Sequence, residues 1–456
     1  MSRPEDILRM LGLVLLPLAC SYDNPAYEAG QGESGPTGTG TGTGMNGAGP
    51  GAGPGGGPGA GPDSNGTLES TTESETTQTT ETTGPEIMCG NGVVEPGELC
   101  LEYEDFEAIL ATPFLVATAR IDPNDYYDVV VAHVGSDTVW YPGGPDGLIT
   151  NTIFALGTSG VEPRDMALGD INGRGDPDYA LAVGSNFDGI LLDVDTENPL
   201  LLDPPGPEGN FPTRVALGDV MGDDGLADLL AVTIGDEDRL LAYPLGPQGP
   251  TGSLPTFDEE ICNEPLGVEF ADVDDNGRDD ALVVCRGSDE LVVVYSTPGG
   301  GLSHSAIDHF STEGGAPESL AIADLDDDGD LDVVVTLQDS GEILALINED
   351  DSDDFDTPFP PVPVGEGPTD LAIADFNLDE VPDVVVAVQG DGQPQLVVLV
   401  QDGDGDGNGF VLNHFPLPGP AWSVAAGDIN GDTMPDVVTA LPAPPLSAMA
   451  MLLSHP

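Results

Sequence analysis

Seven copies of one short motif lie between residues 116 and 441 of this 456-residue chain. Each copy has an apolar stretch, an Asp-rich loop and a second apolar stretch that opens on aspartate, as in LAIADLDDDGDLDVVVTL (320–337). We call this residue the closing aspartate, because it is the ninth and last position of the loop. The copies are 50 to 53 residues apart, with closing aspartates at Asp128, Asp178, Asp228, Asp280, Asp332, Asp383 and Asp436. Such regular self-similarity restricts the chain to a repeat architecture.

The apolar stretches are about six residues long and rich in Val, Leu and Ala, and no helical period runs through them. They predict strands, and a third strand follows in each copy, for example at 291–295, 342–347 and 395–400. A more irregular fourth strand follows at 410–415. Four short strands per repeat predict a propeller blade, and seven blades suit a closed ring without exposed sheet edges. The predicted fold is therefore all-β, a seven-bladed β-propeller.

The last copy ends at 448–454, one strand short of a full blade. We predict that the segment 104–110 supplies the missing strand, so that the two ends of the propeller meet in blade seven. The alternative is an open or truncated ring.

The loops carry oxygen ligands at alternate positions, which suits a hard divalent cation that takes six to eight oxygens. Four or five carboxylates packed this closely without a cation would repel one another strongly. The copies resemble the FG-GAP/VCBS repeats of integrin α-chain propellers and bacterial surface proteins, over residues 114–453. That resemblance implies Ca²⁺ held by the side chains of positions one, three, five and nine and by the carbonyl of position seven. The predicted metal residues are Asp272, Asp274, Asn276, Asp280, Asp324, Asp326, Asp328, Asp330, Asp332, Asp375, Asn377, Asp379, Asp383, Asp428, Asn430, Asp432 and Asp436.

The loops of blades one to three depart from this pattern. Arg120 stands at position one of blade one, Arg174 stands at position five of blade two, and the loop of blade three has one extra residue. Acidic turns that merely face solvent are the favoured interpretation of these three loops, and Arg174 could replace the cation with an internal ion pair. Solvent-facing acidic turns without metal are also the alternative for blades four to seven, where metal binding is the favoured interpretation. A further acidic segment, 401–410, falls where the repeat has a hairpin turn, so metal is not expected there.

The charge balance limits the partners of the chain. It has 82 Asp and Glu residues against 9 Lys and Arg, a formal net charge of −73. Such a surface repels nucleic acid and anionic lipid headgroups and attracts cations. We expect no nucleic-acid partner, and membrane contact only through a lipid anchor.

The N-terminus predicts export. Arg3 and Arg9 precede an apolar run (10–19) that is too short to span a bilayer. The run ends in Ala19–Cys20, which resembles the lipobox of bacterial lipoproteins. That resemblance implies a signal peptide over 1–20, lipidation of Cys20 and, with Ser21 next, an outer-membrane location. An ordinary signal peptide cut nearby is the alternative.

Between this signal and the propeller, residues 21–86 are rich in Gly, Pro and Thr and predict a disordered linker. The segment 87–103 contains CGNGVVEPGELC, which resembles the first half of a Cys-rich repeat found in surface proteins of myxobacteria and their relatives. The predicted propeller domain is 104–456. In an exported chain, paired cysteine spacing suggests two disulfides, Cys89–Cys100 and Cys262–Cys285. The distance between Cys262 and Cys285 is left open by the sequence.

Nothing in the sequence predicts an active site. The five histidines are scattered; His304 and His309 are close, and we expect them in a solvated loop. Nucleophile-elbow, phosphate-loop and dinucleotide motifs are absent from the sequence, so no catalytic or cofactor-binding residue is predicted. The favoured function is a cell-surface module that binds or adheres to an extracellular protein or glycan. The alternatives are a calcium-dependent enzyme acting on extracellular polysaccharide and a structural envelope protein.

Overall fold

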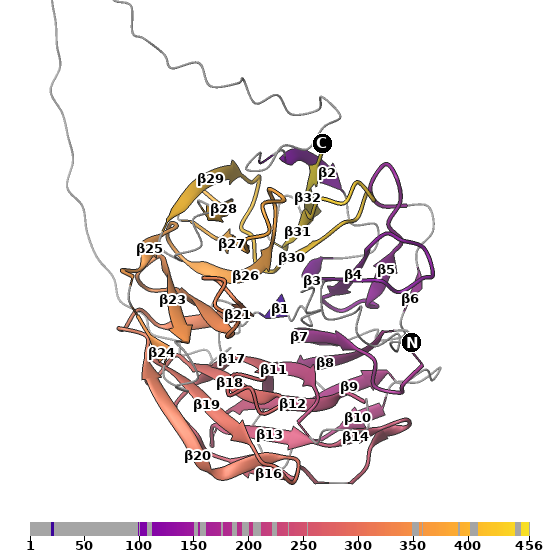
Figure 1. Cartoon of the computed structure of the whole chain (residues 1–456). Coiled ribbons are helices and arrows are strands. Elements are labelled where there is room, and N and C mark those ends of the chain that lie inside the picture. The colour runs from indigo at the N-terminus through magenta and orange to yellow at the C-terminus, as the bar shows by residue number, and fades with distance from the viewer. Residues whose placement is uncertain are drawn as a thin grey trace, which may run out of the picture. The chain divides into compact units, whose positions relative to one another are not determined.

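The computed structural model of the chain describes its propeller almost completely. The described residues are 20–21, 99, 101–106, 112–149, 154–155, 161–174, 177–184, 189–193, 200–203, 211–220, 226–235, 237–252, 254–348, 355–357, 359–390, 393–401, 409–442 and 448–455. Their regular structure is entirely β-strand, arranged as seven antiparallel blades around a common axis (Figure 1). The predicted all-β, seven-bladed propeller is therefore confirmed.

Each blade is a meander that runs from the axis outward. The innermost strands are β3 (Pro113–Ala119), β7 (Glu162–Gly169), β11 (Phe211–Gly218), β17 (Pro265–Ala271), β21 (Pro317–Ala323), β26 (Pro368–Ala374) and β30 (Val424–Gly427). The second strands are β4 (Asp128–His133), β8 (Asp178–Gly184), β12 (Asp228–Ile234), β18 (Asp280–Cys285), β22 (Asp332–Leu337), β27 (Asp383–Val388) and β31 (Asp436–Leu441). The third strands are β5 (Val139–Tyr141), β9 (Gly189–Asp193), β13 (Arg239–Tyr243), β19 (Glu290–Ser296), β23 (Glu342–Asn348), β28 (Gln395–Gln401) and β32 (Ala448–Ser454).

The outer strands are shorter or more exposed. They are β6 (Phe154–Ala155), β10 (Leu200–Leu202), β16 (Phe257–Glu259), β20 (Leu302–Ser311), β24 (Phe355–Asp356) with β25 (Val362–Pro363), and β29 (Phe410–Pro416). A separate two-stranded hairpin of β14 (Leu245–Gly246) and β15 (Gly249–Pro250) follows β13, and β1 (Cys20–Ser21) pairs with β7.

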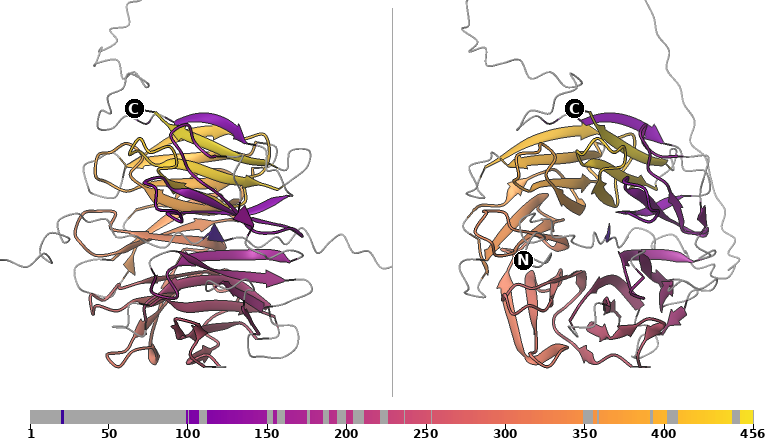
Figure 2. Two further views of the ribbon diagram at one scale, coloured as in Figure 1. Left: turned by 90° about the vertical axis from the view of Figure 1, so that its right-hand side faces the viewer. Right: turned by 45° about the vertical axis from the view of Figure 1, so that its right-hand side comes forward.

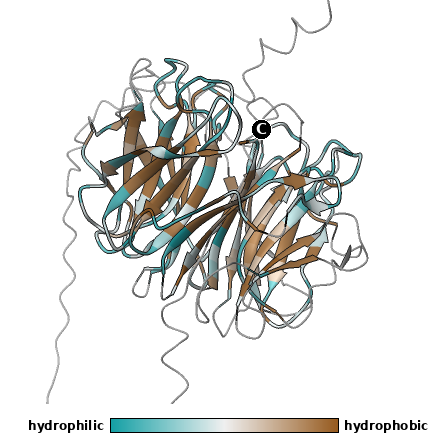
Figure 3. Cartoon of the chain, turned by 90° about the horizontal axis from the view of Figure 1, so that it is seen from below, coloured by the Kyte–Doolittle hydropathy of each residue, from teal (hydrophilic) through white to brown (hydrophobic). Residues whose placement is uncertain are grey.

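Burial explains why the second strands read as nearly continuous apolar runs. Every residue of β4, β18, β22, β27 and β31 is buried, because a neighbouring blade covers each face of the sheet. The outer strand β20 is largely exposed and polar. Figure 3 shows this arrangement, with hydrophobic strands inside and hydrophilic loops at the blade ends. The hydrophobic core therefore lies between blades, so the position of each loop depends on the packing of its blade against the neighbouring blades.

The ring closes in blade seven. Strand β2 (Leu101–Phe106) pairs with β32, from Leu101 opposite Ser454 to Phe106 opposite Met449 (Figure 2). This confirms the predicted closure by an N-terminal segment, and the strand begins three residues before the predicted segment 104–110. Blade seven thus takes strands from both ends of the propeller.

Several predictions fall on residues outside the described part of the chain. Residues 1–19 of the predicted signal peptide, residues 22–86 of the predicted linker and the pair Cys89–Cys100 are among them. Within the described residues, no helix is long and apolar enough to cross a membrane.

Candidate metal loops and the axial charge cluster

The closing aspartate organises every loop. All seven are buried. In blades one and four to seven, one carboxylate oxygen accepts the N–H of position two, and the other accepts a backbone N–H at or just after the end of the third strand. In blade five, Asp332 Oδ2 accepts from Leu325 N at 2.7 Å, and Oδ1 accepts from Asn348 N at 2.9 Å. Asp128 of blade one makes the same bonds to Ile121 and Gly143, both at 2.9 Å, although position one there is not acidic. These hydrogen bonds to the closing aspartate therefore hold the loop in its fold whether or not the loop has metal ligands.

Backbone conformation turns the odd positions inward. Positions four and six have positive φ in all four loops of blades four to seven, which points the flanking side chains to the same side of the loop. The residues are Asp275, Gly277, Asp327, Gly329, Leu378, Glu380, Gly431 and Thr433. Alternate oxygens can then meet at one centre, as the sequence predicted from their spacing.

Two loops bring three carboxylates within reach of one ion. In blade four, single oxygens of Asp272, Asp274 and Asp280 all lie within 4.8 Å of one another. Blade five has the same arrangement of Asp324, Asp326 and Asp332. Asn276 at position five of blade four donates to Ser296 Oγ at 3.0 Å, and Asp328 at position five of blade five is exposed.

The strongest indication of a cation is in blade five. Oδ1 of Asp324 and Oδ1 of Asp326 are buried and accept no hydrogen bond. A buried, unpaired carboxylate oxygen is costly, and a cation would remove that cost. The residues of this loop therefore fit a bound Ca²⁺, with Asp330 at position seven offering its backbone carbonyl.

Blades six and seven use asparagine at position three. Asn377 Nδ2 donates to Asp379 Oδ2 at 3.0 Å, and Asn430 Nδ2 donates to Asp432 Oδ2 at 3.1 Å. The amide thus relieves part of the repulsion that blade five leaves unrelieved. The remaining predicted ligands of these loops, Asp375, Asp383, Asp428 and Asp436, occupy the same positions as their counterparts in blade five.

Burial shifts the loop carboxyls toward neutrality. It raises the pKa of Asp280, Asp332 and Asp383 to about 7 and the pKa of Asp326 to about 6. Because a hard cation needs ionised ligands, metal and protons compete for these groups.

Blades one to three hold their loops by protein contacts. Tyr127 N of blade one donates to Asp428 O of blade seven at 2.8 Å, and the Arg120 guanidinium lies 5.0 Å from the centre of the Tyr127 ring. Asp219 N of blade three donates to Asp279 Oδ2 of blade four at 2.7 Å. In blade two, the main-chain N–H of Arg174 donates to the position-one carboxylate at 3.1 Å.

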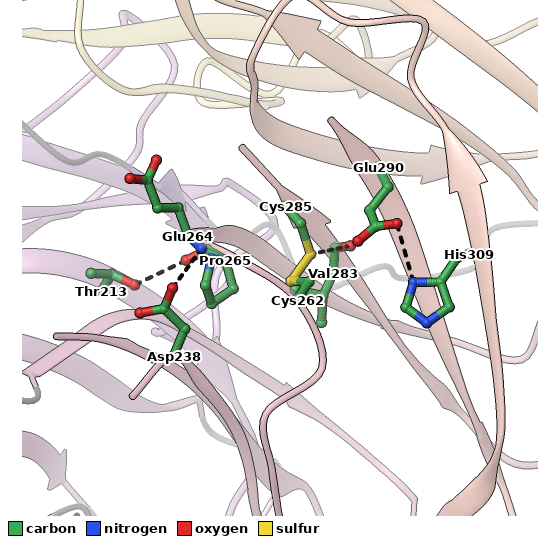
Figure 4. Close-up of a disulfide and its surroundings, with 9 residues drawn as sticks. All are labelled: Thr213, Asp238, Cys262, Glu264, Pro265, Val283, Cys285, Glu290 and His309. Atoms are coloured by element: carbon green, nitrogen blue, oxygen red, sulfur yellow. Dashed lines mark hydrogen bonds and ion pairs between the residues drawn. A yellow bond between two sulfur atoms is a disulfide. The ribbon is translucent and has the colours of Figure 1, made fainter. Parts of the chain in front are cut away.

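Cys262 and Cys285 form a disulfide, as predicted (Figure 4). Their Cα atoms are 6.1 Å apart, which answers the question that the sequence left open. Cys262 lies on the link from blade three into blade four, and Cys285 ends β18. The disulfide thus fixes the link where the two blades meet.

The two neighbouring histidines lie on a strand, which corrects the expectation of a loop. His304 and His309 are on β20, and both are exposed. His304 Nδ1 is 2.9 Å from Glu259 Oε1, and His309 Nδ1 is 3.2 Å from Glu290 Oε2. Neither belongs to a group of three metal-ligating side chains among the described residues.

A cluster of buried charges at the propeller axis escaped the sequence analysis. Glu318 of blade five is fully buried, with Arg286 Nη1 of blade four 3.4 Å from Oε2 and Arg214 Nη2 of blade three 3.8 Å from Oε1. Blades three and five are not neighbours, so the second contact must pass near the axis. We call these residues, with Asp165, Glu269 and Asp370, the axial cluster.

The position of Glu269 shows that the axial cluster is not repeated in every blade. It pairs with the residue two positions after the closing aspartate, and the other six blades have alanine at that register: Ala117, Ala167, Ala216, Ala321, Ala372 and Ala425. Burial, and then the charges of Asp165 and Asp370, hold the pKa of Glu269 well above its usual range. Burial also raises the pKa of Asp165 to about 7 and that of Asp370 to about 8. A repeat alignment would have found Glu269 as the odd member of an alanine column.

Comparison with known proteins supports the repeat assignment. A family model described as FG-GAP-like repeat matches residues 272–335, 324–386 and 375–439. The chain carries FG-GAP-like repeats. These three matches cover the loops of blades four to seven, whose closing aspartates and alternating ligands are the most regular. No curated protein matches the chain.

Solved structures agree on the fold. A crystal structure of BBS1N in complex with ARL6DN has 14% identity and a TM-score of 0.53, and the match covers 78% of this chain and 97% of that chain. The BP39L lectin from Burkholderia pseudomallei has 16% identity and a TM-score of 0.53, with 75% and 96% covered. At these identities the likeness concerns the propeller fold alone.

Proposed function

We propose that this chain is an exported protein of the outer membrane or cell surface, lipid-anchored through Cys20. Its propeller binds calcium in the loops of blades four to seven and works as a binding or adhesion module for an extracellular protein or glycan. The observation that carries the calcium part is the pair of buried, unbonded carboxylate oxygens on Asp324 and Asp326.

The calcium would serve the rigidity of the binding surface. When bound, the ion neutralises the loop carboxylates, and no chemistry beyond that is required of it. The position-two side chains Val273, Leu325 and Phe376 are buried between blades. A metal that fixes positions one and three therefore also fixes the interface between neighbouring blades.

Two similar folds are compatible with a binding role. One is a lectin, and the other was crystallised in complex with a protein. Binding surfaces are grafted on folds of this kind without a shared ligand, so the ligand class stays open between protein and glycan.

Thermal unfolding of the full chain, with calcium titrated against a chelator, tests the metal part. A ligand that binds only the folded state stabilises it by about 2.7 kcal/mol per site at 100 times its dissociation constant. We expect a calcium-dependent rise in Tm that the double substitution Asp324→Ala/Asp326→Ala reduces. The matched control is Asp122→Ala/Asp125→Ala in the loop of blade one, which removes the same charge and should leave the rise intact. No rise in the unsubstituted chain would refute calcium binding.

The binding part needs a separate screen. Glycan and surface-protein arrays probed with the calcium-loaded chain should give calcium-dependent hits. An array that stays negative with calcium present, from a chain that shows the Tm rise, would count against the adhesion role. Recovery of one abundant envelope protein instead would favour the structural alternative.

One observation favours an enzyme as the second candidate. Asp165 and Asp370 supply protonatable carboxyls at the axis, and burial raises their pKa to about 7 and about 8, which suits acid–base work near neutral pH. Glu269 lies beside them, and burial holds its pKa well above the usual range. Turnover of a polysaccharide by the purified chain, lost in Glu269→Gln, would promote this candidate over the binding module.

A further inference from the structure

The metal loops of blades four, five and six are joined by hydrogen bonds through two residues. Asn348 is the last residue of β23, the third strand of blade five. It donates its main-chain N–H to Asp332, the closing aspartate of the candidate metal loop in the same blade, at 2.9 Å. Its side-chain Nδ2 donates to Val273 O at 3.0 Å, and Val273 is position two of the loop in blade four. One residue thus contacts the loops of two blades.

Gln401 repeats this arrangement one blade further on. Its main-chain N–H donates to Asp383 Oδ1 at 2.8 Å, and its Nε2 donates to Leu325 O of the loop in blade five at 2.8 Å. Asn348 and Gln401 are each only 2% exposed. The amide oxygens Asn348 Oδ1 and Gln401 Oε1 accept no hydrogen bond, so within the described residues the link to the preceding loop is the one hydrogen bond of each side chain.

The closing aspartates complete the connection. Val273 N donates to Asp280 Oδ2 at 3.2 Å, and Leu325 N donates to Asp332 Oδ2 at 2.7 Å. The peptide at position two is therefore held on its N–H side by its own loop and on its carbonyl side by the next blade. An unbroken line of hydrogen bonds runs through the residues Asp280, Val273, Asn348, Asp332, Leu325, Gln401 and Asp383.

The chain offers its own contrast at the same register. Ser296 and Ser454 also donate their main-chain N–H to the closing aspartates of blades four and seven, both at 2.7 Å. Their hydroxyls bond position five of their own loop: Ser296 contacts Asn276, and Ser454 donates to Asp432 at 3.1 Å. Serine therefore stays within one loop, whereas asparagine and glutamine reach the loop before.

We propose that Asn348 and Gln401 are positioning residues that couple the metal sites of blades four, five and six, so that a cation in one site raises the affinity of the next. This inference rests on calcium binding by the loops, as proposed above. Fixing positions one and three of one loop orders the position-two carbonyl, which orders the amide of the next blade and its closing aspartate. Networks of this kind strengthen cooperatively, and coupling between two sites is reciprocal. The site of blade seven lacks the link and binds independently of blade six.

The test is calorimetric titration of the full chain with Ca²⁺ in backgrounds that retain two sites. Asp379→Ala/Asp432→Ala leaves blades four and five, and Asp274→Ala/Asp432→Ala leaves blades five and six. We expect cooperative isotherms in both, with the second ion bound at least about fivefold more tightly than the first. Asn348→Ser should abolish this cooperativity in the first background, and Gln401→Ser should abolish it in the second.

Each substitution is the control for the other. Gln401→Ser should leave the isotherm of blades four and five unchanged, and Asn348→Ser should leave that of blades five and six unchanged, which a general loss of stability would not do. Independent sites in both backgrounds, or equal effects of both substitutions in both, would overturn the coupling alone. Absence of calcium binding in the unsubstituted chain would overturn the proposed function and the coupling together.

Discussion

Blades one to three and blades four to seven share a loop but use it differently. Every loop is closed by a buried aspartate that accepts backbone N–H groups, including Asp128 in blade one. Only blades four to seven add oxygen ligands at positions one, three and five. Loops in both halves also contact neighbouring blades, as where Ala227 N of blade three donates to Asp170 O of blade two at 3.3 Å. The ninth position therefore makes the fold, while the earlier positions make the proposed metal site.

The largest expected effect is the pH dependence of the stability that calcium adds to blades four to seven and not to blades one to three. Burial holds the pKa of Asp280, Asp332 and Asp383 at about 7, above the usual 3.8, so their contribution to stability is full below about pH 4 and is lost as pH rises through 7. Calcium bound as proposed would replace those protons. At 100 times the dissociation constant, four sites would add about 11 kcal/mol at pH 8 and far less at pH 5. Scanning calorimetry with calcium and with chelator at both pH values measures this, and an equal calcium effect at both would contradict it.

The closing aspartate should matter equally in both halves when calcium is absent. Asp128→Ala and Asp332→Ala each leave buried N–H groups unpaired, and we expect each to cost about 3 kcal/mol or more in chelator. With calcium, Asp332→Ala should cost more than Asp128→Ala because it also removes a ligand. Urea unfolding measures both differences. A nearly neutral Asp128→Ala would break the claim that this position makes the fold.

The disulfide lies where the two halves meet. Cys262→Ser/Cys285→Ser opens a loop of 23 residues and should lower the free energy of unfolding by about 3 kcal/mol. Because neither cysteine is a metal ligand, the loss should be the same with calcium and with chelator. A loss that disappears in calcium would mean that the metal loops and the link are not independent.

The smallest effect tests whether the metal loops share one backbone conformation. Thr433 and Gly277 both occupy position six, with φ of 78° and 82°. A β-branched residue is strained there, so Thr433→Gly should gain about 1 kcal/mol and Gly277→Thr should lose a similar amount. A Cβ at Gly277 would meet no atom within 4 Å, so backbone strain alone would be measured. Opposite signs in urea unfolding are expected, and equal signs would show that the loops differ.

Much of the fold followed from sequence because local patterns determine it. The predicted strands 291–295, 342–347 and 395–400 are contained in β19, β23 and β28, since alternating or continuous Val and Leu leave few other structures. The closing aspartates were found because they are local to each repeat.

The remaining features depend on contacts between blades. Arg214 and Glu318 lie more than one hundred positions apart in sequence and meet only because the ring brings non-adjacent blades to the axis. Asn348 and Gln401 end strands in which a polar residue is ordinary, and their role appears only when the preceding blade is in place. The start of β2 was misplaced by three residues because an outer strand has little apolar pattern of its own.

Strand β2, which closes the ring, also determines where a mechanical force on the propeller acts first. Tension applied through residues that precede the ring enters at Leu101, whose partner is Ser454. Ser454 is bonded to Asp436 and Asp432 of the last loop. The first residue pair under tension is thus the pair bonded to the loop of blade seven. An ion bound in that loop would resist the separation of β2 from β32 and so the opening of the ring.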